Sequence, residues 1–319
     1  MKKTLVIIAA RGIGDLIYHL PLLRSLHKSY NQKLIILSNK VNHSKDVYKF
    51  ETFYKEIIEF ENTRFSLFKT LKTINNLKNT INKYNVDQLI LTGSPRRLMA
   101  PVYLSRVKEK IIFGGGKFLF SKDKKYQNLT YSEKIMKYAD DLNLPEVNKN
   151  FFLTSNQLNK DDKGEKNKLN IFINLDSHHD QNNWNIKNYI KIITKLIFYD
   201  TKIFINFSPS KSYFLNKFPK EITSSDKVCF THKNSILEIM NIINKCAYVI
   251  GNESGPICLG ASLQKEVHSI YLPIHTPLNS SLKPESEIIN NKIFYYNADK
   301  ESNEVIVEKI TKNILMKIL

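Results

Sequence analysis

Cysteine and long apolar runs are both scarce in this sequence. Its 319 residues include three cysteines, Cys229, Cys246 and Cys258, which form no CxxC pair. A disulfide framework is therefore excluded, and reduced thiols in a reducing compartment are favoured. No apolar run reaches eighteen residues, so we expect no transmembrane helix. The apolar run from Leu5 to Ala10 is too short for a secretory signal, and we expect a cytoplasmic protein.

Arginine is also scarce, although the formal net charge is +18. The excess is almost entirely lysine, spread along the chain. Nucleic-acid binding is disfavoured, because the sequence has no zinc-finger spacing, aromatic RNP-like motif or heptad array. Two interpretations remain open. The lysines form an ordinary solvated surface, or they attract an anionic partner such as a phosphorylated glycolipid or the surface of the inner membrane.

Apolar strands and amphipathic helices alternate along the chain, which predicts an α/β protein with parallel sheets. With 42% hydrophobic and 24% charged residues, the composition is that of a folded protein. The predicted strands are 5–9, 34–37, 88–92, 169–175, 202–207, 247–250 and 267–272. The first predicted helix follows the first strand and ends near residue 30. The other predicted helices span 65–84, 186–198, 235–245, 255–263 and 305–318.

A polar stretch, TSNQLNKDDKGEKNK at residues 154–168, interrupts this alternation and is the best linker candidate. We therefore expect two Rossmann-like domains, residues 1–158 and 159–319, facing each other across a cleft. The final helix could pack anywhere, including back on the N-terminal domain.

A glycine turn, ARGIGDL, follows the first predicted strand. It is not a complete dinucleotide-binding fingerprint, because Ile17 stands at the third glycine position and no ribose-binding acid is evident. Asp15 instead occupies the strand–helix crossing, where open α/β sheets bind ligands. Its carboxylate can act as a general base or can simply cap the helix, and the sequence leaves both open.

A second turn, GNESGP, follows a buried strand and precedes a helix of small residues. The backbone N–H groups of Ser254 and Gly255 would there face a ligand at a helix N-terminus, which suits a diphosphate. The alternative is a plain crossing turn with a serine N-cap.

Together the two turns resemble glycosyltransferase family nine, the bacterial lipopolysaccharide heptosyltransferases. GIGDLIYHLPLLRSL is similar to the opening pattern of that family, and AYVIGNESGPICLGASLQKEVHSIYLP is similar to its C-terminal pattern. VDQLILTGSPRRLMAPVYLSRVKEKIIFGG also matches in character and order. The resemblance runs from about residue 5 to residue 275.

The resemblance implies a GT-B fold and an inverting, metal-independent transfer of a heptose or related sugar. It implies no cofactor, an ADP-sugar as the most favoured donor, and lipopolysaccharide or another surface glycan as acceptor. No DxD motif is present, which agrees with metal independence.

The resemblance also assigns residues to roles. Asp15 falls on the general base, and Gly12 and Gly14 fall on the acceptor-side turn. On the donor side, Ser254 and Gly255 fall on the family's donor-phosphate turn and Glu253 on an aspartate that the family uses at the donor sugar. The full set of donor-side candidates is Ser177, Asn182, Lys211, Asn252, Glu253, Ser254 and Gly255. Arg96 and Arg97 suit a carboxylate or phosphate of an acidic acceptor sugar, with a solvated basic corner as the alternative.

Two positions depart from the family's pattern. Cys258 stands where the family usually has histidine, and Asn182 stands where it has a lysine two residues before Trp184. Lys187 or Lys211 could compensate for the lost cation. These departures keep a second hypothesis open, a non-catalytic protein that binds sugar nucleotides. A nucleotide-sugar epimerase is a weaker alternative, because it needs acid/base residues that the turns do not show.

Two further candidates rest on one loop. His178 and His179 with Asp176 could suggest a metal site, but adjacent loop histidines usually face different ways. Trp184 could stack on a nucleotide, although anchoring a helix to its sheet is the more usual role.

Overall fold

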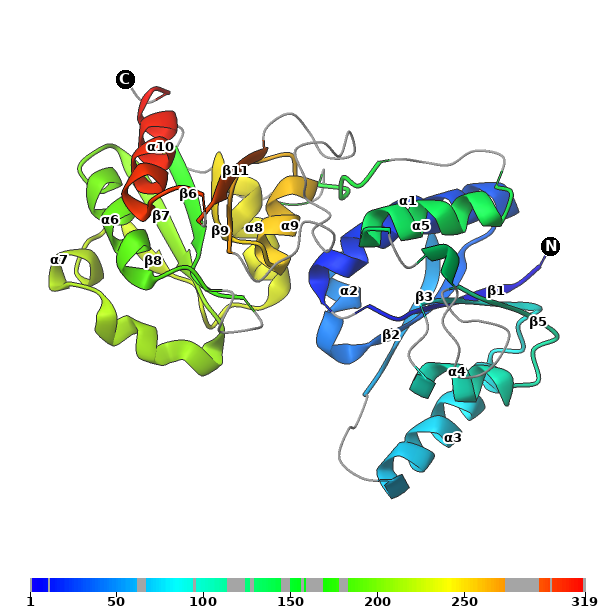
Figure 1. Ribbon diagram of the computed structural model, residues 1–319. Helices are drawn as coiled ribbons and strands as arrows, with labels where there is room; N and C mark the ends of the chain where they lie inside the picture. Colours follow the sequence, from blue (N-terminus) through cyan, green and yellow to red (C-terminus); the bar gives the residue numbers. More distant parts are fainter. Residues whose placement is uncertain are drawn as a thin grey trace. The chain divides into compact units, whose positions relative to one another are not determined.

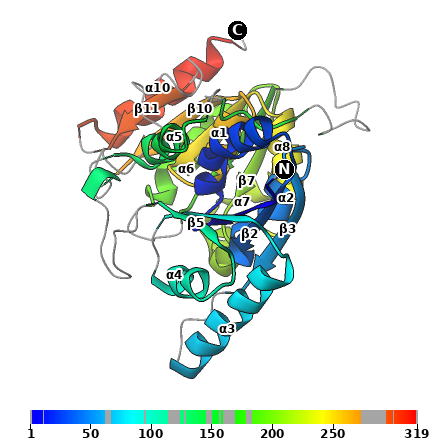
Figure 2. The same ribbon diagram turned by 90° about the vertical axis from the view of Figure 1, so that its right-hand side faces the viewer.

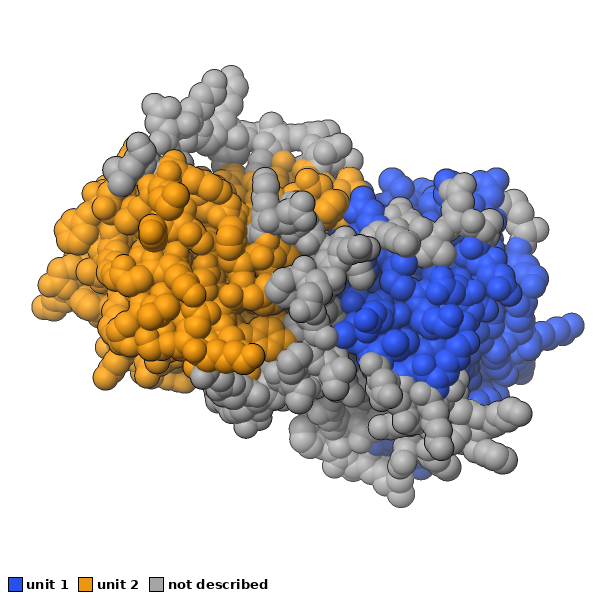
Figure 3. Space-filling view, turned by 45° about the horizontal axis from the view of Figure 1, so that its top comes forward, with its two compact units in different colours: residues 1–151 blue, residues 152–319 orange. Residues whose placement is uncertain are grey.

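The computed structural model describes residues 2–10, 12–61, 67–93, 96–113, 124–126, 129–144, 150–155, 158, 169–177, 183–272, 293–298 and 300–317. Within these ranges the side chains of residues 67–69, 96, 97 and 124 are not described. The chain separates into two compact units, Met1–Phe151 and Phe152–Leu319 (Figure 3). Most of the predicted linker, residues 154–168, lies outside the described residues.

The first unit contains a parallel five-stranded sheet with the order β3-β2-β1-β4-β5 (Figure 1). β1 lies at the centre of this sheet, and all five of its residues are buried. Such burial is expected of a strand in a parallel sheet that is covered on both faces. The strands are β1 (Thr4–Ile8), β2 (Leu34–Asn39), β3 (Tyr54–Phe60), β4 (Gln88–Thr92) and β5 (Glu109–Ile112).

Two helix layers cover this sheet. α1 and α5 lie side by side over one face, and α3 and α4 lie together over the other (Figures 1 and 2). The apolar stripe of α3 places Leu77 and Ile81 in the core beneath it. The helices are α1 (Ile13–Tyr30), η1 (Lys40–Asn42), α2 (Ser44–Val47), α3 (Leu67–Lys83), α4 (Arg96–Tyr103), η2 (Lys124–Tyr126) and α5 (Tyr131–Asp141).

The second unit contains a parallel six-stranded sheet with the order β11-β10-β9-β6-β7-β8. Counted within the unit, this is the strand order of a doubly wound dinucleotide-binding fold, and the first sheet has the same order without a sixth strand. The strands are β6 (Leu169–Asn174), β7 (Thr201–Asn206), β8 (Val228–Phe230), β9 (Tyr248–Asn252), β10 (Glu266–Tyr271) and β11 (Ile293–Asn297).

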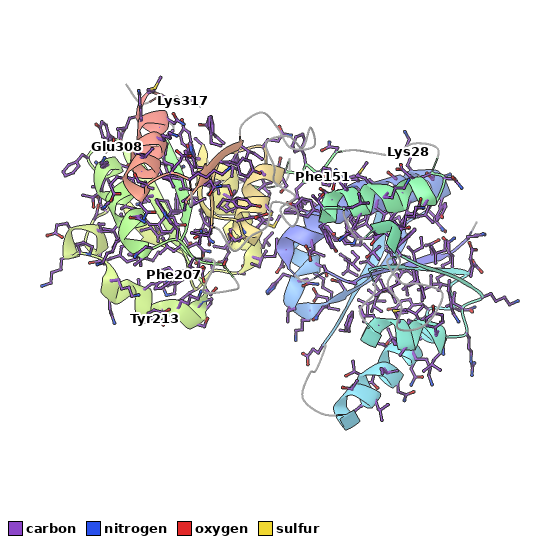
Figure 4. The ribbon with its side chains drawn as sticks, in the orientation of Figure 1. Lys28, Phe151, Phe207, Tyr213, Glu308 and Lys317 are labelled. Atoms are coloured by element: carbon purple, nitrogen blue, oxygen red, sulfur yellow. The ribbon has the colours of Figure 1, made fainter. Side chains whose placement is uncertain are left out.

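Helices cover both faces of this sheet as well. Ile250 faces the core shared with α6 and α10, whereas the neighbouring Val249 packs against α9 on the opposite face. α10 packs on α6, and Lys195 of α6 pairs with Glu308 of α10, which is labelled in Figure 4. The helices are α6 (Ile186–Leu196), η4 (Pro209–Lys217), α7 (Lys220–Thr223), α8 (Ile236–Lys245), α9 (Gly255–Ser262) and α10 (Asn303–Leu315).

The predicted α/β class with two parallel sheets is therefore confirmed. Within the described part of the chain, no helix has both the length and the apolarity that crossing a bilayer requires.

Candidate active site

The first candidate region is the carboxyl end of β1 and β4, where the strand order of the first sheet reverses. Open α/β sheets bind ligands at this switch point. Asp15 is the third residue of α1, and Gly12 is the N-cap residue. The helix-cap interpretation of Asp15 is therefore wrong. Its partly exposed carboxylate instead lies in the first helical turn, where the helix dipole favours a negative charge.

Buried side chains hold the backbone around Asp15. His19 is fully buried, with Nδ1 2.7 Å from the carbonyl oxygen of Asp15 and Nε2 2.8 Å from Oγ1 of Thr92. The hydroxyl of Tyr48 donates to the carbonyl of Leu16 at 2.6 Å. Burial lowers the pKa of His19 to about 4 and raises that of Tyr48 well above its usual value. The turn carrying Asp15 is thus fixed by neutral groups.

The other acceptor-side candidates lie at the same edge of the sheet. Gly12 and Gly14 are partly exposed, and no atom lies within 4 Å of the position that a Cβ on Gly12 would take. Arg96 is the first residue of α4, the helix that follows β4 in the chain, but its side chain and that of Arg97 lie outside the described residues. Gly93 has φ +92°, which requires glycine where the chain leaves β4.

The second candidate region is the switch point between β6 and β9. The two strands approach so closely at Gly251 that a Cβ there would stand 2.5 Å from the backbone oxygen of Asn174. Ser254 is the N-cap residue of α9, yet its hydroxyl makes no capping bond and instead accepts from Nδ2 of Asn174 at 3.1 Å. That hydroxyl keeps its own proton to donate. Gly255 begins α9, so its amide is one of the unpaired donors of a helix N-terminus.

Neutral polar side chains continue from Ser254 along the carboxyl edge of the sheet. Oδ1 of Asn174 accepts from Nδ2 of Asn206 at 2.8 Å, and Oδ1 of Asn206 lies 3.3 Å from the hydroxyl of Thr231. Sequence reasoning missed this row. A signal was nevertheless present, because β6 and β7 both end in the letters IFIN and β9 also ends on asparagine.

Lys211 lies at this edge too, beside Ser177. Its ammonium is 3.4 Å from Oδ2 of Asp176 and 3.3 Å from the carbonyl oxygen of Ser177. The backbone N–H and hydroxyl of Ser208 also donate to the buried carboxylate of Asp176. Asp176 is thus committed to internal partners, while His178 and His179 lie outside the described residues. Among the residues that are described, no cluster of three His, Cys, Asp or Glu side chains could hold a metal ion.

The family model of glycosyltransferase family 9 (heptosyltransferase) matches residues 120–309, which is more than half of the chain. The chain belongs to glycosyltransferase family 9. The predicted family resemblance is confirmed, and so is the prediction of glycosyltransferase activity. The matched range contains the second switch point, whereas Asp15 precedes it. No curated protein sequence matches the chain.

Solved structures of the family share the fold along nearly the whole chain. A family 9 glycosyltransferase from Veillonella parvula has a TM-score of 0.74 and 15% identity, covering 99% of this chain and 90% of that one. Escherichia coli ADP-heptose lipopolysaccharide heptosyltransferase II has a TM-score of 0.71 and 14% identity, covering 99% of each chain. E. coli heptosyltransferase WaaC, solved with ADP-2-deoxy-2-fluoro heptose, has a TM-score of 0.74 and 12% identity, covering 98% and 99%.

Within this family 9 chain, Asn252 has a structural role. It is 1% exposed, and its Oδ1 accepts from the backbone N–H of Trp184 at 2.9 Å and from the hydroxyl of Tyr189 at 2.8 Å. Trp184 is itself in the core, where it packs edge-on against Tyr189. The tryptophan therefore anchors its loop to the sheet, and Asn252 ties that loop to the end of β9.

The structure describes one of the two positions that depart from the family pattern. Cys258 is buried on α9, and the pKa of Tyr295 is raised by burial first and then by the carboxylate of Glu253. Asn182 lies outside the described residues. Of the two lysines considered as substitutes, Lys187 is exposed at the start of α6, whereas Lys211 is held at the carboxyl edge.

Proposed function

We propose that the protein transfers a heptose or related sugar from a nucleoside-diphosphate donor, most favourably ADP, to an anionic surface glycan such as lipopolysaccharide. The observation that carries the proposal is the first turn of α9. It brings unpaired backbone N–H groups, the hydroxyl of Ser254 and the Gly251 close approach to one switch point. A helix N-terminus of this kind stabilises a diphosphate without a metal ion.

Lys211 supplies the cation in this proposal. Its ammonium lies beside Ser177 at the edge that carries Asn174 and Ser254, and it replaces the lysine that the family has at position 182. E. coli WaaC, which shares the fold, was solved with an ADP-sugar analogue, and this supports ADP as the donor nucleotide.

Asp15 acts as the general base. It removes the proton from an acceptor hydroxyl while that oxygen attacks the anomeric carbon on the face opposite the diphosphate. The bond from the anomeric carbon to the diphosphate breaks, and the diphosphate leaves with the electron pair. A single displacement of this kind inverts the anomeric configuration.

The acceptor and the compartment follow from charge and thiol chemistry. A net charge of +18, with Arg96 and Arg97 at the start of α4, favours a phosphorylated or carboxylated glycan and contact with an anionic inner membrane. All three cysteines are free thiols, which favours the cytoplasm. We propose no cofactor beyond the nucleotide sugar.

The decisive experiment is a binding comparison of two N-cap serines. ADP, GDP, UDP and CMP are first ranked by thermal shift, since a ligand at 100 times its Kd raises the free energy of unfolding by about 2.7 kcal/mol.

Ser254→Ala is then compared with Ser302→Ala. Ser302 is the N-cap of α10, and its hydroxyl does accept a capping bond from the backbone N–H of Val305. We expect Ser254→Ala to weaken ADP binding with little loss of stability. Ser302→Ala should keep ADP affinity but lose about 0.5–2 kcal/mol of stability. Equal ADP affinity in both variants would overturn the donor site.

A second candidate function is sugar-nucleotide binding without catalysis, favoured by Cys258 and Asn182. Release of ADP from ADP-heptose separates the two functions. The non-catalytic function would be favoured if the protein bound ADP tightly but formed no ADP from ADP-heptose in the presence of lipopolysaccharide extracted from heptose-deficient bacteria.

A further inference from the structure

A bridge of two buried side chains connects the end of β4 to the helical turn that carries Asp15. Thr92 is the last residue of β4 and is 1% exposed, and His19 is fully buried one helical turn beyond Asp15. The imidazole ring spans the space between them, with one nitrogen on each partner. Both ring nitrogens are therefore satisfied, as a buried imidazole requires.

The direction of each hydrogen bond follows from the partners. The carbonyl oxygen of Asp15 can only accept, so Nδ1 of His19 carries the proton and donates. A neutral ring then has a lone pair at Nε2, and the hydroxyl of Thr92 must donate to it. The carbonyl oxygen of Ile7 lies 3.1 Å from the same hydroxyl. The shorter contact at 2.8 Å takes the proton, because a hydroxyl that turned away would set two lone pairs against each other.

Two further buried side chains complete the support. The hydroxyl of Tyr48 donates to the carbonyl of Leu16, and the amide of Asn42 donates to the carbonyl of Ala10 at 3.2 Å. Both side chains are fully buried. Three peptide groups between residues 10 and 16 are thus held by side chains, and the His19 bridge contacts the carbonyl oxygen of Asp15 itself.

We propose that His19 and Thr92 form a positioning pair that fixes the carboxylate of Asp15 for proton removal from the acceptor. The inference rests on the proposed role of Asp15 as the base. An apolar side chain would fill the same volume without desolvating two nitrogens, so the polar bridge contributes direction rather than bulk. A general base is effective only when it is held within hydrogen-bonding reach of the proton it removes, and a misplacement of 1 Å can lower the rate about 10²-fold.

The test uses two matched substitutions of Thr92 in the full chain. Thr92→Val removes the hydroxyl and keeps the shape, whereas Thr92→Ser removes a methyl group and keeps the hydroxyl. Turnover is followed as ADP release from ADP-heptose, with lipopolysaccharide from heptose-deficient bacteria or water as acceptor. We expect Thr92→Val to lower kcat about 10–100-fold with the KM for ADP-heptose unchanged. Thr92→Ser should retain most of kcat. Equal losses in both variants would overturn the proposal, since packing alone would then explain them.

A double-mutant cycle separates positioning from a general structural role. If Thr92 acts through Asp15, Thr92→Val should have no further effect on kcat in an Asp15→Asn background. An additive further loss in the double variant would show that Thr92 does not act through Asp15. Full turnover in Asp15→Asn alone would instead remove the base from the proposed function, which is a distinct outcome.

Amide hydrogen exchange gives a readout that needs no turnover. Thr92→Val should raise deuterium uptake over residues 12–18 relative to Thr92→Ser, because the first turn of α1 loses its tie to β4. Equal uptake in the two variants would contradict the positioning pair even if no acceptor supported turnover.

Discussion

The turns that follow β1 and β9 lie beside the switch points of two sheets with the same strand order, but their chemistry is opposite. The turn after β1 carries the carboxylate of Asp15, and buried side chains hold its peptide carbonyls. The turn after β9 carries its acid, Glu253, before the helix begins and none in the first turn of the helix, and a row of neutral amides and hydroxyls continues from Ser254. In the proposed function, the first turn accepts a proton and the second presents hydrogen-bond donors. A shared fold therefore says where each site lies, and the side chains alone say what it does.

The two turns also differ in how tightly glycine is required. Gly12 stands in open space in extended backbone, while Gly251 lies against the backbone of β6. The first turn is thus accessible at Gly12, and buried side chains hydrogen-bond to its carbonyl oxygens. The second turn is compact because β6 and β9 approach closely at Gly251.

The largest expected effect concerns Asp15, the acid within the first turn of α1. Asp15→Asn should lower turnover by about 10²–10⁴-fold, because asparagine cannot take the acceptor's proton. Stability should fall by only about 0.3–1 kcal/mol, the value of a carboxylate near a helix N-terminus. Steady-state ADP release and urea unfolding measure the two quantities. Near-wild-type turnover in this variant would remove the chemical difference between the turns.

The second prediction uses the pH dependence of the support beneath the first turn. Burial lowers the pKa of His19 from its ordinary value of 6.5 to about 4, against the opposing effect of its bond to Asp15. Below about pH 6.5 the unfolded chain takes up a proton that the folded chain does not. The free energy of unfolding should therefore fall by about 3 kcal/mol as the pH is lowered from 6.5 to 4, with no contribution from this group above that range.

Chemical denaturation across that range checks the sign and size of the effect. His19→Asn should abolish this part of the pH dependence. His43→Asn is the matched control, because His43 is half exposed and its left-handed backbone suits asparagine. If the pH dependence of stability were the same in His19→Asn as in the wild type, a group other than His19 would be responsible for it.

The smallest expected effect compares the two glycines. Gly251→Ala should lose about 1–3 kcal/mol of stability, because its Cβ would meet the backbone oxygen of Asn174 at 2.5 Å. Gly12→Ala should change stability by less than about 1 kcal/mol, since nothing stands near its Cβ. Urea unfolding of the two variants measures the difference. Similar losses would mean that the two turns do not differ in packing.

The sequence predicted the interior strands of both sheets and missed the outermost ones. β1, β4 and β9 are buried along their whole length and read as continuous apolar runs. β3, β5, β8 and β11 are the edge strands, and most of their residues are partly or fully exposed. A strand with mixed exposure has neither an apolar run nor a clean alternation, so hydrophobic pattern alone does not identify it.

The candidate site could be predicted only where its residues are neighbours in sequence. Asp15, Ser254 and Gly255 stand in glycine turns that the letters reveal. The bridge from His19 to Thr92 spans 73 residues, and the contact between Asn174 and Ser254 spans 80. Such pairs become visible only when the strand order is known. The sequence left a helix cap open as the role of Asp15, because it does not show that the helix already begins at Ile13.

The position of α10 has a consequence for how the chain matures during translation. Ile306, Ile310 and Ile314 share one core with α6, the first helix described in the second unit, and the indole N–H of Trp184 donates to Asn303 at the start of α10. Domains fold in the order in which they are synthesised, so the first unit can be complete while the second still lacks its final layer. A stop codon or protease cut before Asn303 would leave an apolar face of the second unit uncovered. Chaperones and proteases would then act on the exposed face and lower the amount of protein in the cell.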